Sequence, residues 1–322
     1  MIKVGILGCN TLRAAELVRI LLNHPDVELA WVRDNTGDGN TRLDHVVPGI
    51  VGETDLRVEP LGSSVDGVDV VFLTSSRDEV SVQLENLALP DALRVIDLSG
   101  LHNHNHNHGA QASWTYGLSE MQRRVLVHDA HLVTVPGDAA SAALLALMPM
   151  ARNLMLNNPL TLHVAIGECV MPRGVRTLDG MTASQWAVDQ QHEVTMALRQ
   201  CQSSFNQPVE LSVTPLAERR TLAAAARFKC GVDGEMIRQL YEQYYSDHNF
   251  VFIVDRPIVT ADVENTNKCL LYLDKNESTG LLTVHAVMDV LLKGSAGTAV
   301  HAMNLLFGLH ERVGLSLKAT GC

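Results

Sequence analysis

An apolar strand, an amphipathic helix and a second apolar strand are expected at the start of the chain. Residues 2–8 form an apolar run, residues 12–23 carry apolar side chains at helical spacing, and residues 27–32 are apolar again. This order predicts a βαβ unit, with which doubly wound nucleotide-binding sheets begin. Further strands are expected at residues 68–73, 94–98 and 132–135. The fold class is therefore α/β, with a doubly wound and mostly parallel sheet.

Beyond residue 150 the pattern changes to an α+β arrangement. Helices are expected at residues 181–201, 233–245 and 296–309, and strands at residues 160–166, 209–213, 222–228, 250–254, 269–273 and 281–287. We predict a first domain of residues 1–140, completed by the C-terminal helix at 296–322, and a second domain of residues 141–295.

Composition and charge limit the location and the partners of the protein. The 322 residues, 46% of them hydrophobic, suffice for two domains. A net charge of −11 argues against nucleic acid and anionic membrane surfaces as partners. The longest mostly apolar run, residues 139–151, is shorter than the roughly 20 residues of a membrane-spanning helix. Without a secretory signal or a Cys-x-x-Cys pair, the chain is expected to be cytoplasmic with reduced thiols.

The stretch Val135-Pro136-Gly137-Asp138 joins a predicted strand to a predicted helix at residues 139–150. Backbone N–H groups and the helix dipole at such a helix start lower the pKa of a nucleophile or stabilise an anion. Asp138 therefore lies at a position suited to chemistry. The structural interpretation is an N-cap, because aspartate accepts bonds from the first amides and stabilises a helix by ~1 kcal/mol over alanine.

The turn after the first strand lacks the Gly-x-Gly-x-x-Gly fingerprint of dinucleotide sites. It holds one glycine, Gly8, and Leu12 and Arg13 put side chains where a cofactor needs bare backbone. Arg13 could contact a phosphate, although an exposed arginine in a first helical turn is more common. Asp34, at the end of the second strand, could accept ribose hydroxyls as in NAD-type sites, or it is a turn aspartate.

Four histidines alternate with asparagine in one short segment: His102, His104, His106 and His108. They could gather a divalent metal ion. A polar loop is the favoured interpretation, because alternate side chains of an extended chain share a face without converging on one ion.

Segments spread over the whole chain carry a resemblance to a known family. They are residues 1–17, 69–74, 97–99, 116–118 and 135–137, and above all residues 265–269 (Asn-Thr-Asn-Lys-Cys) and 291–309. In these segments the chain resembles the N-acyl-γ-glutamyl-phosphate reductases of arginine biosynthesis, which are similar to aspartate-semialdehyde dehydrogenases. It is most similar to the Bacteroidetes type, which uses N-acetyl or N-succinyl substrates. The resemblance implies a Rossmann-type domain, a C-terminal α+β domain of the semialdehyde dehydrogenase dimerisation type, and NADP(H) as cofactor.

The resemblance also implies where a nucleotide would bind. The implied cofactor positions are Gly8, Asn10, Thr11, Arg13, Asp34, Ser75, Pro136, Gly137, Val290 and Lys293. Several positions depart from the family pattern. Thr11, Leu12 and Ala14 replace glycines of a Gly-x-x-Gly-Tyr-x-Gly loop, and Val290 replaces an asparagine. These replacements put nucleotide binding in doubt.

The catalytic positions of the family also differ. The family's chemistry uses a cysteine after Pro-Gly, whose thiolate attacks the acyl phosphate before hydride reduces the thioester, and Asp138 stands at that position. In the family's His-x-His-x-Pro-Glu-Ile stretch, Val188 and Gln190 take the histidine positions. His192 is the nearest histidine, but its helix points it to a different face. Cys169, in the loop that replaces a Gly-rich segment, is a weak candidate nucleophile without helix-end activation.

These departures favour a non-catalytic relative that acts by binding. Such a protein would bind a small acyl-glutamate-like ligand, form a homo-oligomer (dimer or tetramer), or assemble with an active paralogue. The first alternative is an active reductase, or another NAD(P)-dependent oxidoreductase, with a non-standard site. The second alternative is a metal-binding protein that uses the histidine loop.

Overall fold

The computed structural model describes residues 1–62, 64–103, 114–171 and 181–319. The chain divides into two compact units. Unit 1 comprises Met1–Pro136 and Ser295–Ser316, and unit 2 comprises Gly137–Gly294 and Leu317–Cys322. No helix in these described ranges is long and apolar enough to cross a membrane.

Unit 1 is built on a seven-stranded sheet in the order β3-β2-β1-β4-β5-β7-β6, and every pairing in it is parallel. The strands are β1 (Ile2–Leu7), β2 (Val27–Asp34), β3 (Val58–Pro60), β4 (Val70–Leu73), β5 (Arg94–Asp97), β6 (Thr115–Tyr116) and β7 (Leu132–Thr134). β1 lies between β2 and β4, so the order of the strands reverses beside it. In open α/β sheets ligands bind outside the carboxyl ends of the strands at this switch point.

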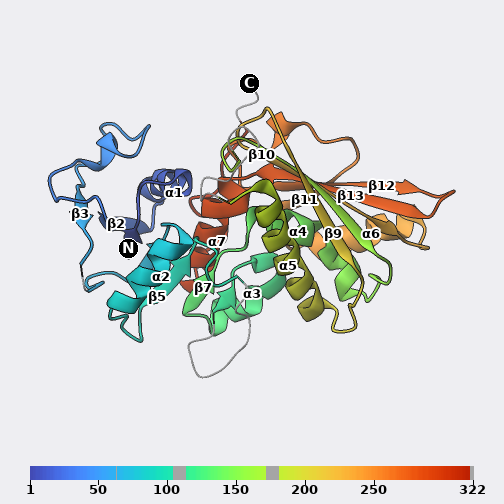
Figure 1. Ribbon diagram of the computed structural model, residues 1–322, viewed down its shortest axis with the longest axis horizontal. Coiled ribbons are helices and arrows are strands. Elements are labelled where there is room, and N and C mark those ends of the chain that lie inside the picture. The colour runs from blue at the N-terminus through green and yellow to red at the C-terminus, as the bar shows by residue number, and fades with distance from the viewer. Residues whose placement is uncertain (63, 104–113, 172–180, 320–322) are drawn as a thin grey trace. The chain divides into compact units, whose positions relative to one another are not determined.

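Four helices belong to the part of unit 1 that the structure describes. They are α1 (Leu12–Leu22), α2 (Arg77–Asn86), α3 (Ser119–His128) and α7 (Gly297–Leu306), together with a short 3₁₀ turn, η1 (Leu43–His45). α7 packs against both α1 and α3, although it comes from the far end of the chain (Figure 1). The C-terminal segment thus completes the unit that the N-terminal segment begins.

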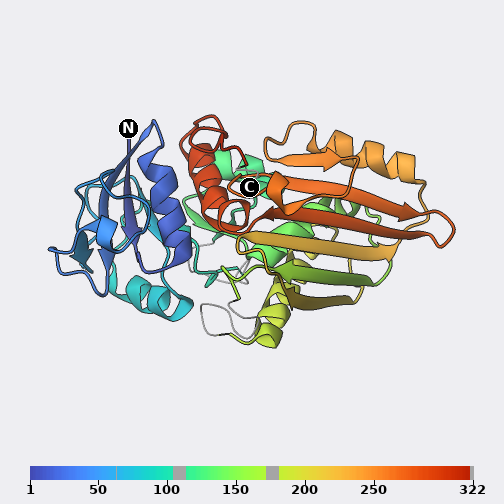
Figure 2. The same cartoon turned by 90° about the horizontal axis from the view of Figure 1, so that it is seen from above.

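Unit 2 has a mixed six-stranded sheet in the order β11-β12-β13-β10-β8-β9. The strands are β8 (Leu160–Ile166), β9 (Val209–Pro215), β10 (Thr221–Lys229), β11 (Val251–Val254), β12 (Cys269–Asn276) and β13 (Leu281–Asp289). The helices are α4 (Asp138–Arg152), α5 (Ala183–Cys201) and α6 (Gly234–Tyr245), with a 3₁₀ turn, η3 (Thr260–Asp262). Figure 2 shows the strands side by side. α4 packs on β10 and β13 and also contacts α5.

The structure confirms the α/β fold class, the mostly parallel sheet and the expected apolar strands. It adds elements that the sequence analysis missed. β3 and β6 are too short to show an alternating pattern. α2 buries only Val80 and Gln83, so its sequence carries no apolar stripe. The last helix, α7, ends at Leu306, three residues earlier than expected, because Gly308 has a left-handed φ of +66° that ends it. A π-helical turn, η4 (Leu292–Ala296), precedes it.

Helix α4 is buried from residue 139 to residue 151. A helix that is apolar on every face can only lie inside a core. Pro149 interrupts its hydrogen-bond ladder, because proline has no N–H for the carbonyl of Leu145 four residues earlier. The hydroxyl of Tyr245, on α6, donates to that carbonyl at 2.5 Å. Tyr241, one turn earlier on α6, donates in the same way to the next carbonyl, that of Ala146, at 2.6 Å.

We expect Tyr245→Phe to lower the free energy of unfolding by about 1–3 kcal/mol, because it leaves the Leu145 carbonyl buried without a donor. Pro149→Ala supplies an amide hydrogen to that carbonyl, so the tyrosine substitution should cost less in the Pro149→Ala background. Urea unfolding of the single and double variants measures this coupling. Tyr272→Phe, on a partly exposed residue of β12, is the matched control. If Tyr245→Phe cost the same in both backgrounds, the Tyr245 hydroxyl would not be replacing the amide hydrogen that Pro149 lacks.

In unit 1, His24 follows α1 and is 4% exposed. Its Nδ1 accepts the amide of Asp26 at 3.3 Å, so its Nε2 carries the proton and donates to Oδ1 of Asn304 at 3.0 Å. Burial lowers the pKa of His24 below its ordinary value of 6.5, although Asn304 and Asp26 act in the opposite direction. The folded state therefore keeps this imidazole neutral at pH values at which the unfolded chain already takes up a proton.

The stability of the protein is therefore expected to depend on pH. The stabilising contribution of neutral His24 is complete above its unfolded pKa and is lost as the pH falls toward its lower folded pKa. The free energy of unfolding should decrease from about pH 7 to about pH 5. His24→Gln should reduce this slope, whereas His131→Gln, on an exposed residue, should leave it unchanged. Urea unfolding midpoints measured from about pH 7 to about pH 5 test this prediction. If His24→Gln left the pH dependence of the unfolding free energy unchanged, His24 would not be its cause.

Candidate functional site

The first amides of α4 are bound by side chains of unit 2. Gly137 N donates to Oε1 of Glu193 at 2.9 Å, and Ala140 N donates to Oε1 of Gln190 at 3.0 Å. Ala139 N donates to Oδ1 of Asp138 at 2.8 Å. The interpretation of Asp138 as the N-cap is wrong: Gly137 is the N-cap, and Asp138 is the first helical residue. Asp138 binds only the next amide, and the other two bonds come from α5, which is a distant segment of the chain.

Helix α5 brings Gln190 and Glu193 to this site because they lie three residues apart on its buried face. Gln190 is 3% exposed and Glu193 is 0% exposed. Gln190 also explains why residue 137 is a glycine. A Cβ at that position would lie 2.4 Å from both Nε2 and Oε1 of Gln190. Sequence reasoning missed Glu193, although its spacing from Gln190 was a usable signal.

The other candidates from the catalytic pattern lie elsewhere. Val188 is 66% exposed and His192 is also exposed, so both lie away from the buried face of α5 that carries Gln190. Cys169 lies in the turn after β8. Its amide donates to the carbonyl of Arg219, and its side chain is buried. The structure therefore brings Asp138 and Gln190 together and adds Glu193.

Unit 1 carries a candidate site of its own, at the carboxyl ends of β1 and β4. Gly8 has a φ of +98°, and a Cβ there would lie 2.3 Å from Oγ of Ser75 and 2.8 Å from its N. Only glycine fits this close approach. Thr74, the residue before Ser75, donates through Oγ1 to the carbonyls of Leu7 and Gly8 at 3.1 and 2.6 Å. The two strand ends are thus locked together at the switch point.

Asp34 ends β2 and is 6% exposed. Its Oδ2 accepts the amide of Cys9 at 2.9 Å, and its Oδ1 accepts from Asn10 Nδ2, Thr36 N and Thr36 Oγ1 at 2.8, 2.9 and 2.7 Å. Burial by itself raises the pKa of Asp34, but the bonds from Thr36 and Cys9 outweigh it, and the pKa is lowered. Asp34 is therefore an ionised carboxylate that fixes the turn after β1. Burial, with the neighbouring Asp34 charge, raises the pKa of Cys9 to about 12.

Thr11, Leu12 and Ala14, which replace family glycines, all lie at the start of α1. Thr11 is the N-cap, and its Oγ1 accepts the amide of Ala14 at 3.1 Å. Leu12 is 39% exposed. Arg13 donates through Nη1 to the carbonyl of Leu98, so its guanidinium is bound within unit 1. The side chain of Thr11 thus occupies one of the amides that a phosphate would use at this helix start.

Comparison with known proteins identifies the family. Residues 3–128 match the NAD-binding domain of semialdehyde dehydrogenases, and residues 187–289 match their dimerisation domain. The N-acetyl-gamma-glutamyl-phosphate reductase of Parabacteroides distasonis is 36% identical over 329 residues, 99% of each chain. That of Bacteroides thetaiotaomicron is 36% identical over 330 residues, again 99% of each. The chain belongs to the N-acetyl-gamma-glutamyl-phosphate reductase family.

Solved structures agree with the fold of this reductase family member. Aspartate semialdehyde dehydrogenase II of Vibrio cholerae has a TM-score of 0.70 at 13% identity, covering 96% of this chain and 99% of that one. Aspartate semialdehyde dehydrogenase of Candida albicans, solved with NADP, has a TM-score of 0.70 at 11% identity, covering 95% and 98%. At these identities the likeness establishes the shared fold.

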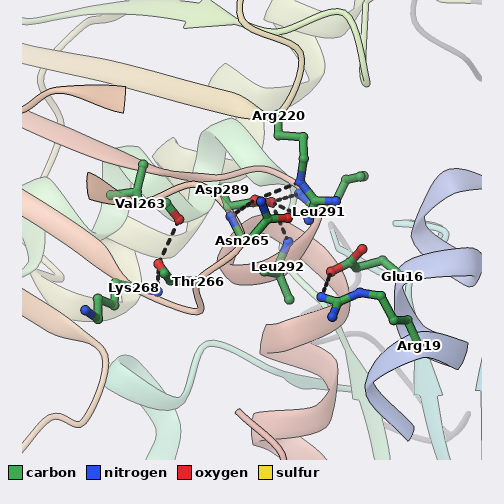
Figure 3. A network of polar contacts seen from close by, with 10 residues as sticks. All are labelled: Glu16, Arg19, Arg220, Val263, Asn265, Thr266, Lys268, Asp289, Leu291 and Leu292. Atoms are coloured by element: carbon green, nitrogen blue, oxygen red, sulfur yellow. Dashed lines mark hydrogen bonds and ion pairs between the residues drawn. The ribbon is translucent and has the colours of Figure 1, made fainter. Parts of the chain in front are cut away.

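The last cofactor positions implied by the reductase family follow β13 in unit 2. Val290 is 1% exposed, and Lys293 is 0% exposed with its Nζ 5.9 Å from the ring centre of Phe250. Asp289, just before them, is also fully buried. It accepts from Arg220 Nε at 2.9 Å, from Asn265 N at 2.8 Å, and from the amides of residues 291 and 292 at 2.9 and 3.0 Å (Figure 3). This carboxylate fixes the turn that carries Val290 and Lys293.

The histidine segment is only partly described. His102 Nδ1 lies 2.8 Å from Oδ2 of Asp97, and its ring stacks on Trp114 with centroids 3.8 Å apart. His104, His106 and His108 lie outside the described residues. Within the described ranges, no group of three or more His, Cys, Asp and Glu side chains could hold a metal ion. Metal binding by the four histidines stays a prediction.

Proposed function

We propose that this member of the reductase family binds ligands on the family scaffold without reducing an acyl phosphate. The observation that carries the proposal is the start of α4, where Asp138, Gln190 and Glu193 occupy the first amides. An acyl phosphate approaching this helix start would meet two carboxylates instead of free N–H groups and a thiolate.

Asp138 is a poor substitute for a cysteine nucleophile. A carboxylate that attacks an acyl phosphate forms a mixed anhydride, which is about as activated as the substrate, so covalent catalysis gains nothing. Gln190, at the position of a family histidine, has an amide that cannot act as a general base at neutral pH. Loss of a covalent nucleophile costs on the order of 10⁶ in kcat in a well-studied hydrolase, and loss of a general base costs roughly 10² to 10⁴.

The purified chain is therefore expected to show no turnover with N-acetyl- or N-succinyl-γ-glutamyl phosphate and NADPH or NADH. Loss of the reduced nicotinamide's absorbance is the measurement, with the Parabacteroides distasonis relative assayed in parallel. The reverse reaction, from the semialdehyde with phosphate and oxidised cofactor, should also be absent. A rate of about 1 s⁻¹ or more, which is ordinary for an enzyme, would overturn the proposal.

The ligands that we propose are a nucleotide and a small acyl-glutamate-like molecule. The match of residues 3–128 to an NAD-binding domain and the close fit of Gly8 against Ser75 support the nucleotide. The match of residues 187–289 to a dimerisation domain supports a homo-oligomer, or assembly with an active paralogue. Light scattering of the pure chain should give the mass of a dimer or tetramer, and a monomer at micromolar concentration would exclude the homo-oligomer.

A further inference from the structure

The six-stranded sheet of unit 2 has two different faces. Helices α4, α5 and α6 pack against its strands, and every second residue of β10 is buried, namely Leu222, Ala224, Ala226 and Phe228. Alternate side chains of a strand point to opposite faces, so the residues between them belong to the other face. We call this other face the open face. It carries His163, Ala225, Arg227, Tyr272, Asp274 and His285, all of them exposed or half-buried.

The strand register arranges the open face symmetrically about β13. Ala225 on β10 pairs with His285 on β13, which pairs with Tyr272 on β12. Two residues further along β10 and β12, Arg227 and Asp274 pair with the same residue of β13. Directly paired residues point to the same face. A small side chain and a cation therefore flank β13 on one side, and a large side chain and an anion flank it on the other.

The two charges of this arrangement are available to another molecule. Arg227 and Asp274 are exposed, and neither makes a hydrogen bond or an ion pair within the part of the chain that the structure describes. Their strands lie two strand spacings apart, which is roughly 10 Å. A complementary partner has to present an anion opposite Arg227 and a cation opposite Asp274 at that same spacing.

A second copy of the same face meets this requirement. Rotation by half a turn about an axis that lies in the contact plane along β13 exchanges the positions of β10 and β12. Arg227 then lies opposite the partner's Asp274, and Ala225 lies opposite the partner's Tyr272. Both contacts occur twice, because the surface is the same on the two copies. The face is thus complementary to itself in charge and in side-chain size.

His285 lies on this axis, so two copies would bring their imidazoles together. Burial lowers the pKa of His285 below its ordinary value of 6.5; Asp274 raises it and Arg227 lowers it. The ring of Tyr272 lies beside it, with centroids 5.9 Å apart. His163, the other histidine of the open face, has both ring nitrogens within 3.2 Å of hydroxyls on β9. Protonation of His285 would place two like charges at the centre of the contact.

We propose that the open face binds a second copy of this chain about an axis along β13, that reciprocal pairs of Arg227 and Asp274 fix its orientation, and that His285 weakens the assembly in acid. The inference rests on the homo-oligomer of the proposed function and assigns its contact surface. The segment that matches a dimerisation domain, residues 187–289, includes β10, β12 and β13.

Charge reversal of the full chain tests the orientation, with light scattering as the measurement. Arg227→Asp and Asp274→Arg should each weaken assembly at least about a hundredfold, because each places like charges opposite one another at two equivalent positions. An equimolar mixture of the two variants should assemble again, since every contact between them joins opposite charges. The variant with both substitutions should also assemble. Circular dichroism checks that each variant is folded.

Arg238→Asp and Glu242→Arg are the matched controls. They make the same changes in net charge on an exposed ion pair of α6, so assembly should be unaffected by either. A native oligomer that survives Arg227→Asp and Asp274→Arg would overturn the inference. So would folded variants that stay apart when they are mixed, or an equal loss of assembly in the controls.

The pH dependence of assembly is an independent measurement. Between about pH 7.5 and about pH 5.5, the concentration at which half of the native chain assembles should rise about tenfold or more, because the contact excludes two protonated imidazoles. His285→Gln should reduce this rise to about twofold or less. His131→Gln, on an exposed residue of unit 1, should leave it unchanged. The same rise in His285→Gln as in the native chain would overturn the role of His285.

The inference and the proposed function fail separately. A chain that turns over acyl phosphate would overturn the absence of catalysis and leave this contact surface standing. An oligomer that is indifferent to the charge reversals would exclude the contact surface alone. A native chain that is monomeric at micromolar concentration would exclude the homo-oligomer together with the contact surface.

Discussion

Asp138→Cys should give the protein a covalently acylated form that the native chain lacks. The new thiol would be the first residue of the 15-residue helix α4. The helix dipole and first-turn amides stabilise a thiolate there, although Glu193 already occupies the amide of Gly137. Intact-protein mass spectrometry after mixing with N-acetyl-γ-glutamyl phosphate measures the acyl adduct. The native chain should remain unmodified under the same conditions.

Five of the six native cysteines lie among the described residues, and their burial disfavours acylation; Cys322 lies outside the described residues. Cys9, Cys169, Cys230 and Cys269 are buried, and burial raises the pKa of the half-buried Cys201. Asp138→Ser is the matched control. Serine is similar in size to cysteine, but its hydroxyl is a weak nucleophile without a general base. An adduct on the native chain, or none on Asp138→Cys, would show that position 138 does not decide whether this scaffold carries the acyl group.

Asp289→Ala is expected to have the largest effect on stability. Asp289 is fully buried and accepts from the guanidinium of Arg220 and from three backbone amides. Its removal leaves a partly buried cation and three amides without their acceptor. Breaking a buried ion pair from one side costs about 3–5 kcal/mol of unfolding free energy. Urea denaturation of the purified variant tests this value.

Two comparisons test whether the cost of Asp289→Ala comes from its buried ion pair with Arg220. Glu242→Ala breaks a pair with Arg238 on the exposed side of α6, and it should cost only about 0.3–0.5 kcal/mol. Replacing both Arg220 and Asp289 by methionine should cost less than Asp289→Ala alone, because no charge is then stranded. A cost below about 1 kcal/mol for Asp289→Ala would mean that water or a rearranged turn replaces the carboxylate.

Much of the architecture could be predicted from local pattern. The apolar runs that became β1, β2, β4 and β8 are buried on one or both faces, and such burial imposes a pattern visible within a few residues. The same reasoning failed for α2, because a helix that buries two residues leaves no stripe to detect. It failed for β3 and β6, which are edge strands of three and two residues.

The candidate site divides in a similar way. The strand, turn and helix around Asp138 drew attention to this residue, but Gly137 and not Asp138 is the N-cap of α4. The cap bonds come from Gln190 and Glu193, which lie 50 and 56 residues from the amides they accept. Spacing on α5 shows that the two share a face, yet it does not show which helix that face covers.

The sequence by itself determined the order of strands and helices, the resemblance to the reductase family, and the replacement of a nucleophilic cysteine by Asp138. These features depend on the identity of single residues and on the spacing of apolar residues within short segments. The tertiary structure alone decided that α5 covers the start of α4, that Asp289 gathers Arg220 and three amides, and that Gly8 lies against Ser75. Each of these depends on the packing of segments far apart in the chain, and no local pattern encodes that packing.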